Sequence, residues 1–252
     1  MPHPKSSQVI TRDKYDAILF DLDGVITNTA SLHAACWKQM FDEYLKKRAT
    51  QRGEAFRPFD IATDYRLHVD GKPRFDGVRD FLTSRGIKLP EGTPADPPEA
   101  ETVGGLGNRK NELINDVIEE RGVQAYEGSV KFIHQLHNQG YKIGVVSSSQ
   151  NCGIVLKAAK LDHFFDAQVD GHMIEDQHLP GKPAPDTFLI GAELLGVGPK
   201  RTVVIEDAIS GVQAGRNGNF GLVIGVARKG NAEELLHQGA HMVVNDLGEL
   251  VD

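Results

Sequence analysis

The chain has 252 residues, of which 40% are hydrophobic, and a formal net charge of -7. This length and hydrophobic content suit a globular enzyme core in one large or two small domains. The acidic balance argues against a nucleic-acid-binding surface, no run is apolar enough to span a membrane, and two cysteines are too few for a disulfide framework.

The first segment, residues 1–14, is polar and contains no apolar signal core. We expect it to fray. A chain without a secretion signal and with only Cys36 and Cys152 is expected to be cytoplasmic, with both thiols reduced. We further expect a monomer that binds a small molecule and neither nucleic acid nor membrane.

An apolar run, Ala17–Phe20, predicts a buried strand of a parallel sheet, and it ends in two carboxylates and a glycine. Ligands of open α/β sheets bind outside the carboxyl ends of the strands, and side chains two apart in an extended segment point the same way. Asp21 and Asp23 are therefore expected to face one site, where Mg²⁺ is the simplest partner to offset their repulsion. A strand-ending turn is the alternative, and the pair alone does not decide.

The next clear parallel strand comes only at 141–147, a gap far longer than a helical crossover needs, so an inserted unit is expected between them. Its pattern predicts helices over 30–48, 75–84 and 109–120. Residues 92–107 contain three prolines and the pair Gly104-Gly105, which predicts a loop.

From residue 127 the pattern alternates strand and helix to the end, with strands near 141, 166, 202, 221 and 241. This order predicts an α/β fold, a doubly wound Rossmann-like core with a parallel sheet and an inserted helical cap. The expected domains are a core of residues 1–28 and 126–252 and a cap of residues 29–125.

Three serines, Ser147, Ser148 and Ser149, close the strand near 141, and a helix is expected from about 151 to 159. Hydroxyls and free N–H groups at such a junction can bind a phosphate. An ordinary serine cap of the helix is the alternative interpretation.

Lys182 precedes two prolines, of which Pro185 is suited to open the helix that runs through Leu195. This stiff frame can aim Lys182 inward, although most lysines are simply solvated. The strand near 202 ends in Glu206 and Asp207, where Asp207 has the alternative role of capping the helix over 208–217.

These signals all lie at strand ends. Four acids, one lysine and a hydroxyl cluster together suit a dianionic phosphate and Mg²⁺, and such a combination is hard to obtain by chance.

The constellation resembles the haloacid dehalogenase superfamily of phosphotransferases, whose four motifs are present in the expected order, and within it the β-phosphoglucomutases. The similarity covers most of the predicted core, but between about residues 45 and 125 it is confined to short, separate stretches. Without the resemblance, His33 and Trp37 of the first predicted cap helix would be assigned to core packing. Arg74 and Lys110 would be assigned to solvated surface charge.

The resemblance implies that Asp21 is the nucleophile, forming an aspartyl-phosphate, and that Asp23 is the general acid and base. It implies phosphate binding by Ser147, Ser148 and Lys182. The implied metal ligands, for Mg²⁺, are Asp21, the backbone carbonyl of Asp23, Glu206 and Asp207. The implied substrate-binding residues are Thr29, His33, Trp37, Arg74, Lys110, Ser149 and Asn151.

The expected activity is the interconversion of β-glucose 1-phosphate and glucose 6-phosphate, with the cap closing over the sugar phosphate. A sugar-phosphate phosphatase uses the same motifs and remains the alternative. A catalytically inactive binding module is a third class, against which the intact acids argue. Residues 48–59 and 92–107 look like cap insertions, so the identity of the sugar phosphate stays open.

Overall fold

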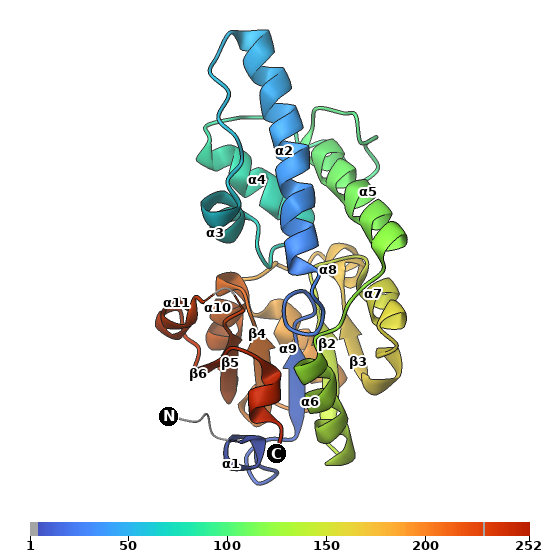
Figure 1. The fold of residues 1–252 in the computed structure, drawn as a ribbon, viewed down its shortest axis with the longest axis vertical. Helices are drawn as coiled ribbons and strands as arrows, with labels where there is room; N and C mark the ends of the chain where they lie inside the picture. Colours follow the sequence, from blue (N-terminus) through green and yellow to red (C-terminus); the bar gives the residue numbers. More distant parts are fainter. Residues whose placement is uncertain (1–4, 229) are drawn as a thin grey trace. The chain divides into compact units, whose positions relative to one another are not determined.

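A computed structural model describes residues 5–228 and 230–252 of the chain. They form two compact units, which Figure 1 draws as a sheet with helices and a group of helices. The core unit runs to Thr29 and resumes at Val123, and the cap unit is Ala30–Gly122.

The second boundary lies a few residues before the position expected from the sequence. The backbone N–H of Asn28 donates to the Gln124 carbonyl at 2.8 Å, and that of Tyr126 donates to the Ile26 carbonyl at 2.9 Å. Because these bonds tie residues 124–126 to the segment after the first strand, that stretch belongs to the core.

The core contains a six-stranded, fully parallel sheet with the order β3-β2-β1-β4-β5-β6. Each strand lies where the sequence predicted it, and the strands are β1 (Ala17–Phe20), β2 (Lys142–Val146), β3 (Ala167–Val169), β4 (Thr202–Glu206), β5 (Leu222–Val226) and β6 (Met242–Val244). The chain builds outward from β1 on one side and then crosses to β4 on the other. The order therefore reverses at β1, where open α/β sheets bind their ligands.

Helices cover both faces of the sheet. Leu19 packs in an apolar cluster with Phe188 of α9 (Asp186–Leu194), whereas the ring of the next residue, Phe20, lies 6.3 Å from that of Phe132 on α6 (Glu127–Asn138). Successive side chains of a strand point to opposite faces, so the sheet is doubly wound, as predicted. The core helices are α1 (Ser6–Val9), α6 (Glu127–Asn138), α7 (Cys152–Ala158), α8 (Gly171–Asp176), α9 (Asp186–Leu194), α10 (Ile209–Asn217) and α11 (Ala232–His237), with short 3-10 turns at η2 (Asp162–Phe164), η3 (Pro199–Arg201) and η4 (Leu247–Leu250).

The cap unit is helical, as predicted. Its elements are α2 (Ala30–Arg52), the π-helical turn η1 (Ile61–Tyr65), α3 (Arg66–His68), α4 (Arg74–Ser84) and α5 (Val103–Arg121). The first helix ends four residues later than expected. Its apolar face packs around Phe41, whose ring centre lies 5.1 Å from that of Phe59 and 4.2 Å from that of Phe81.

The predicted loop over 92–107 was too long, because α5 already begins at Val103. The Thr102 hydroxyl caps this helix by accepting from the N–H of Gly105 at 2.9 Å. The glycine pair, which suggested a loop, serves close packing instead. A Cβ on Gly104 would lie 2.2 Å from the Thr93 carbonyl oxygen, so only glycine lets the preceding segment lie against the helix.

The N-terminal segment does not fray over the part that the structure describes. Ile10 is buried, and its carbonyl accepts from the Tyr141 hydroxyl at 2.8 Å. Residues 1–4 lie outside the described residues. None of the helices in the described ranges combines the length and the apolar character that a bilayer crossing requires.

Candidate active site

Asp21 follows the last residue of β1, level with the ends of the two neighbouring strands. Its backbone N–H donates to the Ile205 carbonyl of β4 at 2.9 Å, which continues the sheet pairing by one residue. The side chain is almost wholly buried. The sheet therefore fixes both the backbone and the direction of this carboxylate.

Lys182 is buried against two acids from different strands. Its Nζ donates to Asp21 Oδ1 at 2.6 Å and to Glu206 Oε1 at 2.7 Å. A third contact reaches the Val146 carbonyl, the last residue of β2, at 3.4 Å. The lysine thus joins the ends of three adjacent strands. It points inward, as expected from its proline-rich segment.

The carboxylates around Lys182 carry more negative charge than this one lysine can offset. Burial lowers the pKa of Lys182, but Asp21 and Glu206 more than offset this, so its pKa is raised and the ammonium stays charged. Burial raises the pKa of Asp21 well above its usual range, and repulsion from Glu206 and Asp23 opposes the help that Lys182 gives. One lysine does not compensate this group of carboxylates, so the site favours a further cation.

Three of the acids can share such a cation. Asp21, Glu206 and Asp207 each offer a carboxylate oxygen, and these oxygens lie within 4.8 Å of one another. The N-cap position of α10 is occupied by Ala208, which makes no side-chain cap bond. Instead Glu206 Oε2 accepts from the Ala208 N–H at 2.8 Å, which orients Glu206.

The loop after β1 is shaped to admit Asp207. Gly24 has a φ of 93°, and a Cβ there would lie 2.2 Å from Asp207 Oδ2. Glycine is therefore required both by the backbone conformation and by the approach of the carboxylate. Hard oxygen donors gathered in this cradle fit a cation such as Mg²⁺.

Asp23 is held by a chain of hydroxyl groups. The Thr29 hydroxyl donates to Asp23 Oδ1, and the Thr27 hydroxyl lies 2.7 Å from that of Thr29. Both threonines are fully buried, whereas Asp23 is partly exposed. Thr29, which the resemblance placed on the substrate, is thus also the residue that orients Asp23.

The serines after β2 form a turn rather than a helix cap. The Ser147 hydroxyl accepts from the Ser149 N–H at 3.1 Å, and the Ser149 hydroxyl accepts from the Asn151 N–H at 3.1 Å. Ser148 lies between them and is half-buried. The amide Nδ2 of Asn151 is buried and has no hydrogen-bond partner among the residues described, so this turn ends in a donor that a ligand oxygen can satisfy.

Three of the predicted cap residues form one cluster within the cap unit. Lys110 Nζ lies 2.8 Å from His33 Nδ1 and 5.2 Å from the centre of the Trp37 ring. All three side chains are buried. A lysine ammonium can only donate, so His33 Nδ1 accepts and its proton is on Nε2.

Arg74, the fourth predicted cap residue, is the first residue of α4. Its Nη2 donates to Asn108 Oδ1 at 3.1 Å, and its Cζ lies 4.5 Å from the centre of the Phe75 ring. These contacts join the first turn of α4 to α5 and hold the guanidinium in one orientation.

Sequence reasoning missed Arg228, which supports the loop that carries Asp23. Its Nε donates to the Gly24 carbonyl at 3.1 Å and its Nη2 to the Val25 carbonyl at 3.3 Å. The guanidinium also stacks 3.6 Å from the centre of the Tyr126 ring. No local signal marks this residue, because an arginine after a strand is ordinarily a solvated surface charge.

Comparisons with known proteins agree with this geometry. A family model described as haloacid dehalogenase-like hydrolase matches residues 15–219. A β-phosphoglucomutase from Mycobacterium bovis is 50% identical over 99% of this chain and 97% of its own length. A β-phosphoglucomutase from Bacillus subtilis is 32% identical over 93% of this chain and 91% of its own. The crystal structure of a Clostridium difficile β-phosphoglucomutase superimposes with a TM-score of 0.73, at 26% identity over 94% of this chain and 93% of that chain.

Proposed function

Because this chain belongs to the haloacid dehalogenase-like hydrolase family, we propose that it is a phosphotransferase that interconverts β-glucose 1-phosphate and glucose 6-phosphate. The structural observation that carries the proposal is the buried Asp21 carboxylate, held by Lys182 beside Glu206 and Asp207 at the point where the strand order reverses. The similarity to phosphoglucomutases over nearly the whole chain supports the mutase reaction. We retain the expectation of a cytoplasmic monomer that binds no nucleic acid.

Mg²⁺ is the proposed cofactor, held by Asp21, Glu206, Asp207 and the backbone carbonyl of Asp23. The donor set is all oxygen, the three carboxylates can reach one ion, and the cluster carries excess negative charge. When bound, the ion offsets the charge of the phosphate so that an anionic nucleophile can approach it.

The proposed first step uses Asp21 as the nucleophile. One of its carboxylate oxygens forms a bond to phosphorus while the bond from phosphorus to the sugar oxygen breaks. The ammonium of Lys182 is bonded to Asp21, so its positive charge lies beside the proposed nucleophile. Lys182, Ser147 and Ser148 are proposed to bind the equatorial phosphate oxygens, whose charge grows in the transition state.

Asp23 is the proposed general acid and base. It gives a proton to the sugar oxygen that leaves phosphorus, and it takes the proton of the hydroxyl that attacks the aspartyl-phosphate. The bond from Thr29 supports this role, since it helps to hold the carboxylate in one orientation. In the mutase cycle the phosphoenzyme phosphorylates the 6-hydroxyl of β-glucose 1-phosphate, and the resulting bisphosphate later returns its 1-phosphate to Asp21.

The substrate itself is proposed to be bound by Ser149 and Asn151 of the core and by His33, Trp37, Arg74 and Lys110 of the cap. The buried and unpartnered Nδ2 of Asn151 supports this assignment in the core. In the cap, the planar guanidinium of Arg74 suits the second phosphate of a bisphosphate.

The mutase and the phosphatase differ in which molecule accepts the phosphoryl group. With enzyme primed by acetyl phosphate and supplied with β-glucose 1-phosphate, we expect glucose 6-phosphate to form much faster than inorganic phosphate. A sugar hydroxyl outcompetes water only when it is held in near-attack geometry. Both products are followed by ³¹P NMR, with Asp21→Asn protein as the control. Rapid release of phosphate with no glucose 6-phosphate would favour the phosphatase.

Removing the metal is expected to abolish turnover. Without a cation, the carboxylates repel the substrate phosphate, and burial together with repulsion from Glu206 and Asp23 keeps the pKa of Asp21 raised. Activity should vanish in EDTA and return with Mg²⁺, and Asp207→Asn should need about tenfold or more Mg²⁺ for half-maximal rate. The matched control is Glu193→Gln, an exposed acid of α9, which should behave as wild type. Full activity in EDTA, with no metal found by elemental analysis, would contradict the metal site.

A further inference from the structure

A charged hollow lies within the cap unit, and the proposed reaction assigns no role to the residues that line it. Its volume is about 390 Å³, and it is bounded by the end of α2, the segment that follows α2, and the end of α4. Three arginines line it, Arg48, Arg57 and Arg85, together with one acid, Glu54. This segment is the first cap insertion that the sequence pattern singled out.

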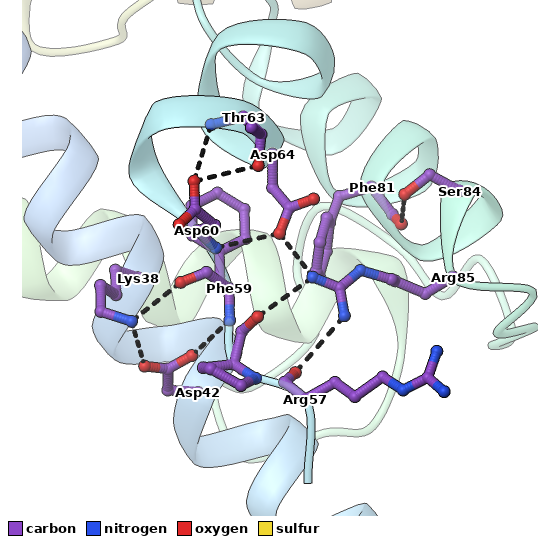
Figure 2. Close-up of polar contacts among 11 residues, drawn as sticks. Lys38, Asp42, Arg57, Phe59, Asp60, Thr63, Asp64, Phe81, Ser84 and Arg85 are labelled. Carbon is purple, nitrogen blue, oxygen red and sulfur yellow. Dashed lines mark hydrogen bonds and ion pairs between the residues drawn. The ribbon is translucent and has the colours of Figure 1, made fainter.

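The arginines are only partly neutralised. Arg48 Nη1 pairs with Glu54 Oε2 at 2.8 Å, and Arg85 Nη2 pairs with Asp64 Oδ2 at 2.5 Å. The guanidinium of Arg57 makes no hydrogen bond or ion pair with any residue that the structure describes, and Figure 2 shows it extended away from the other labelled side chains. The ion pair with Glu54 uses one of the five N–H groups of Arg48, so the hollow keeps both net positive charge and unused donors.

The backbone that carries Arg57 is held in place. The Arg85 guanidinium donates to the Arg57 carbonyl at 3.4 Å and to the Pro58 carbonyl at 3.1 Å. On the other side, the Phe59 N–H donates to Asp42 Oδ1 at 2.7 Å and Lys38 Nζ donates to the Phe59 carbonyl at 2.8 Å (Figure 2). Because these bonds already fix the backbone of the segment, a ligand that binds there does not have to order that backbone.

We propose that this hollow binds a small organic phosphate, at a site separate from the catalytic residues. Three guanidinium groups offer more donors than one carboxylate can accept, whereas a phosphate monoester presents three oxygens and up to two charges. Leu45, Ala49 and Ile87 supply apolar walls for the organic part of the ligand. The proposal does not depend on the reaction assigned to Asp21.

The test is an amide-resolved NMR titration of the full chain at constant ionic strength, with inorganic phosphate, phenyl phosphate and benzoate as probes. Phosphate should produce saturable shifts at Ala55, Ser84 and Ile87, separate from those at Ser147 and Asn151. Phenyl phosphate should bind about threefold tighter than phosphate because of the apolar walls. Benzoate, with the same ring and one carboxylate, should bind at least about threefold more weakly than phenyl phosphate.

The decisive variant is Arg57→Gln, which should weaken binding at the cap amides about tenfold and leave the shifts at Ser147 unchanged. The matched control is Arg52→Gln, which should change the affinity less than about twofold, because Arg52 is an exposed arginine at the end of α2 that does not line the hollow. Arg57→Lys should give an intermediate affinity because it keeps the charge but loses the planar fork. Equal effects of Arg52→Gln and Arg57→Gln, equal affinities for benzoate and phenyl phosphate, or no saturable shift at the cap amides would each overturn the proposal.

Discussion

Asp21→Asn is expected to abolish phosphoenzyme formation and to lower turnover by at least about 10⁴-fold, the scale on which loss of a nucleophile acts in other enzymes. An amide is a poor nucleophile and a weaker ligand for a hard cation, so both proposed roles of Asp21 fail together. The measurement is acid-stable trapping of radiolabel from an acyl-phosphate donor, combined with single-turnover kinetics. Label still trapped at full stoichiometry on the asparagine variant would exclude Asp21 as the nucleophile.

We expect the fold to survive this substitution, so a loss of activity would reflect the chemistry of residue 21 and not unfolding. Burial opposes the charge on Asp21, and the amide has nearly the same size without that charge. Lys182 keeps its second carboxylate partner, Glu206, at 2.7 Å. We therefore expect a thermal unfolding midpoint close to that of the wild type. Asp16→Asn is the matched control, since Asp16 precedes the same strand at its other end and pairs with Arg201.

Asp23→Asn is expected to lower turnover by about 10²- to 10⁴-fold while metal affinity is largely kept. The substitution leaves the backbone carbonyl that is proposed to bind the ion and removes only the group that carries the proton. The asparagine can still accept the hydrogen bond from Thr29, so the loop should keep its conformation. Steady-state kinetics and Mg²⁺ titration followed by calorimetry separate the two effects.

The split between rate and affinity is what distinguishes Asp23 from Asp21. Metal affinity that collapses in parallel with the rate would show that the Asp23 side chain is itself a ligand. Turnover unchanged by Asp23→Asn would remove the acid and base role altogether.

The positions of the strands were predictable because the local pattern specifies them. Most of the six strands are short, largely apolar runs, and those that carry the site end abruptly in polar residues: Asp21 after β1, Ser147 after β2, and Glu206 at the end of β4. A buried parallel strand requires such a run, and the polar residues that succeed parallel strands gather at the edge where those strands end. The local sequence pattern predicted the ends of the cap helices less well than it predicted the strands of the core. The glycine pair in the first turn of α5 suggested a loop, and only the close approach of Thr93 explains why these residues are helical.

By itself the sequence determined the family, the doubly wound core with a helical insertion, and the identity of the acids that come after the strands. Only the tertiary structure decided which charges meet. Lys182 bonds Asp21 across 161 positions of the chain, and Arg228 reaches Gly24 across 204. The arginine hollow of the cap likewise joins the ends of two helices to the segment after the first. Local propensity and hydrophobic period act over a few residues, whereas these contacts depend on how the chain crosses the sheet and packs its helices.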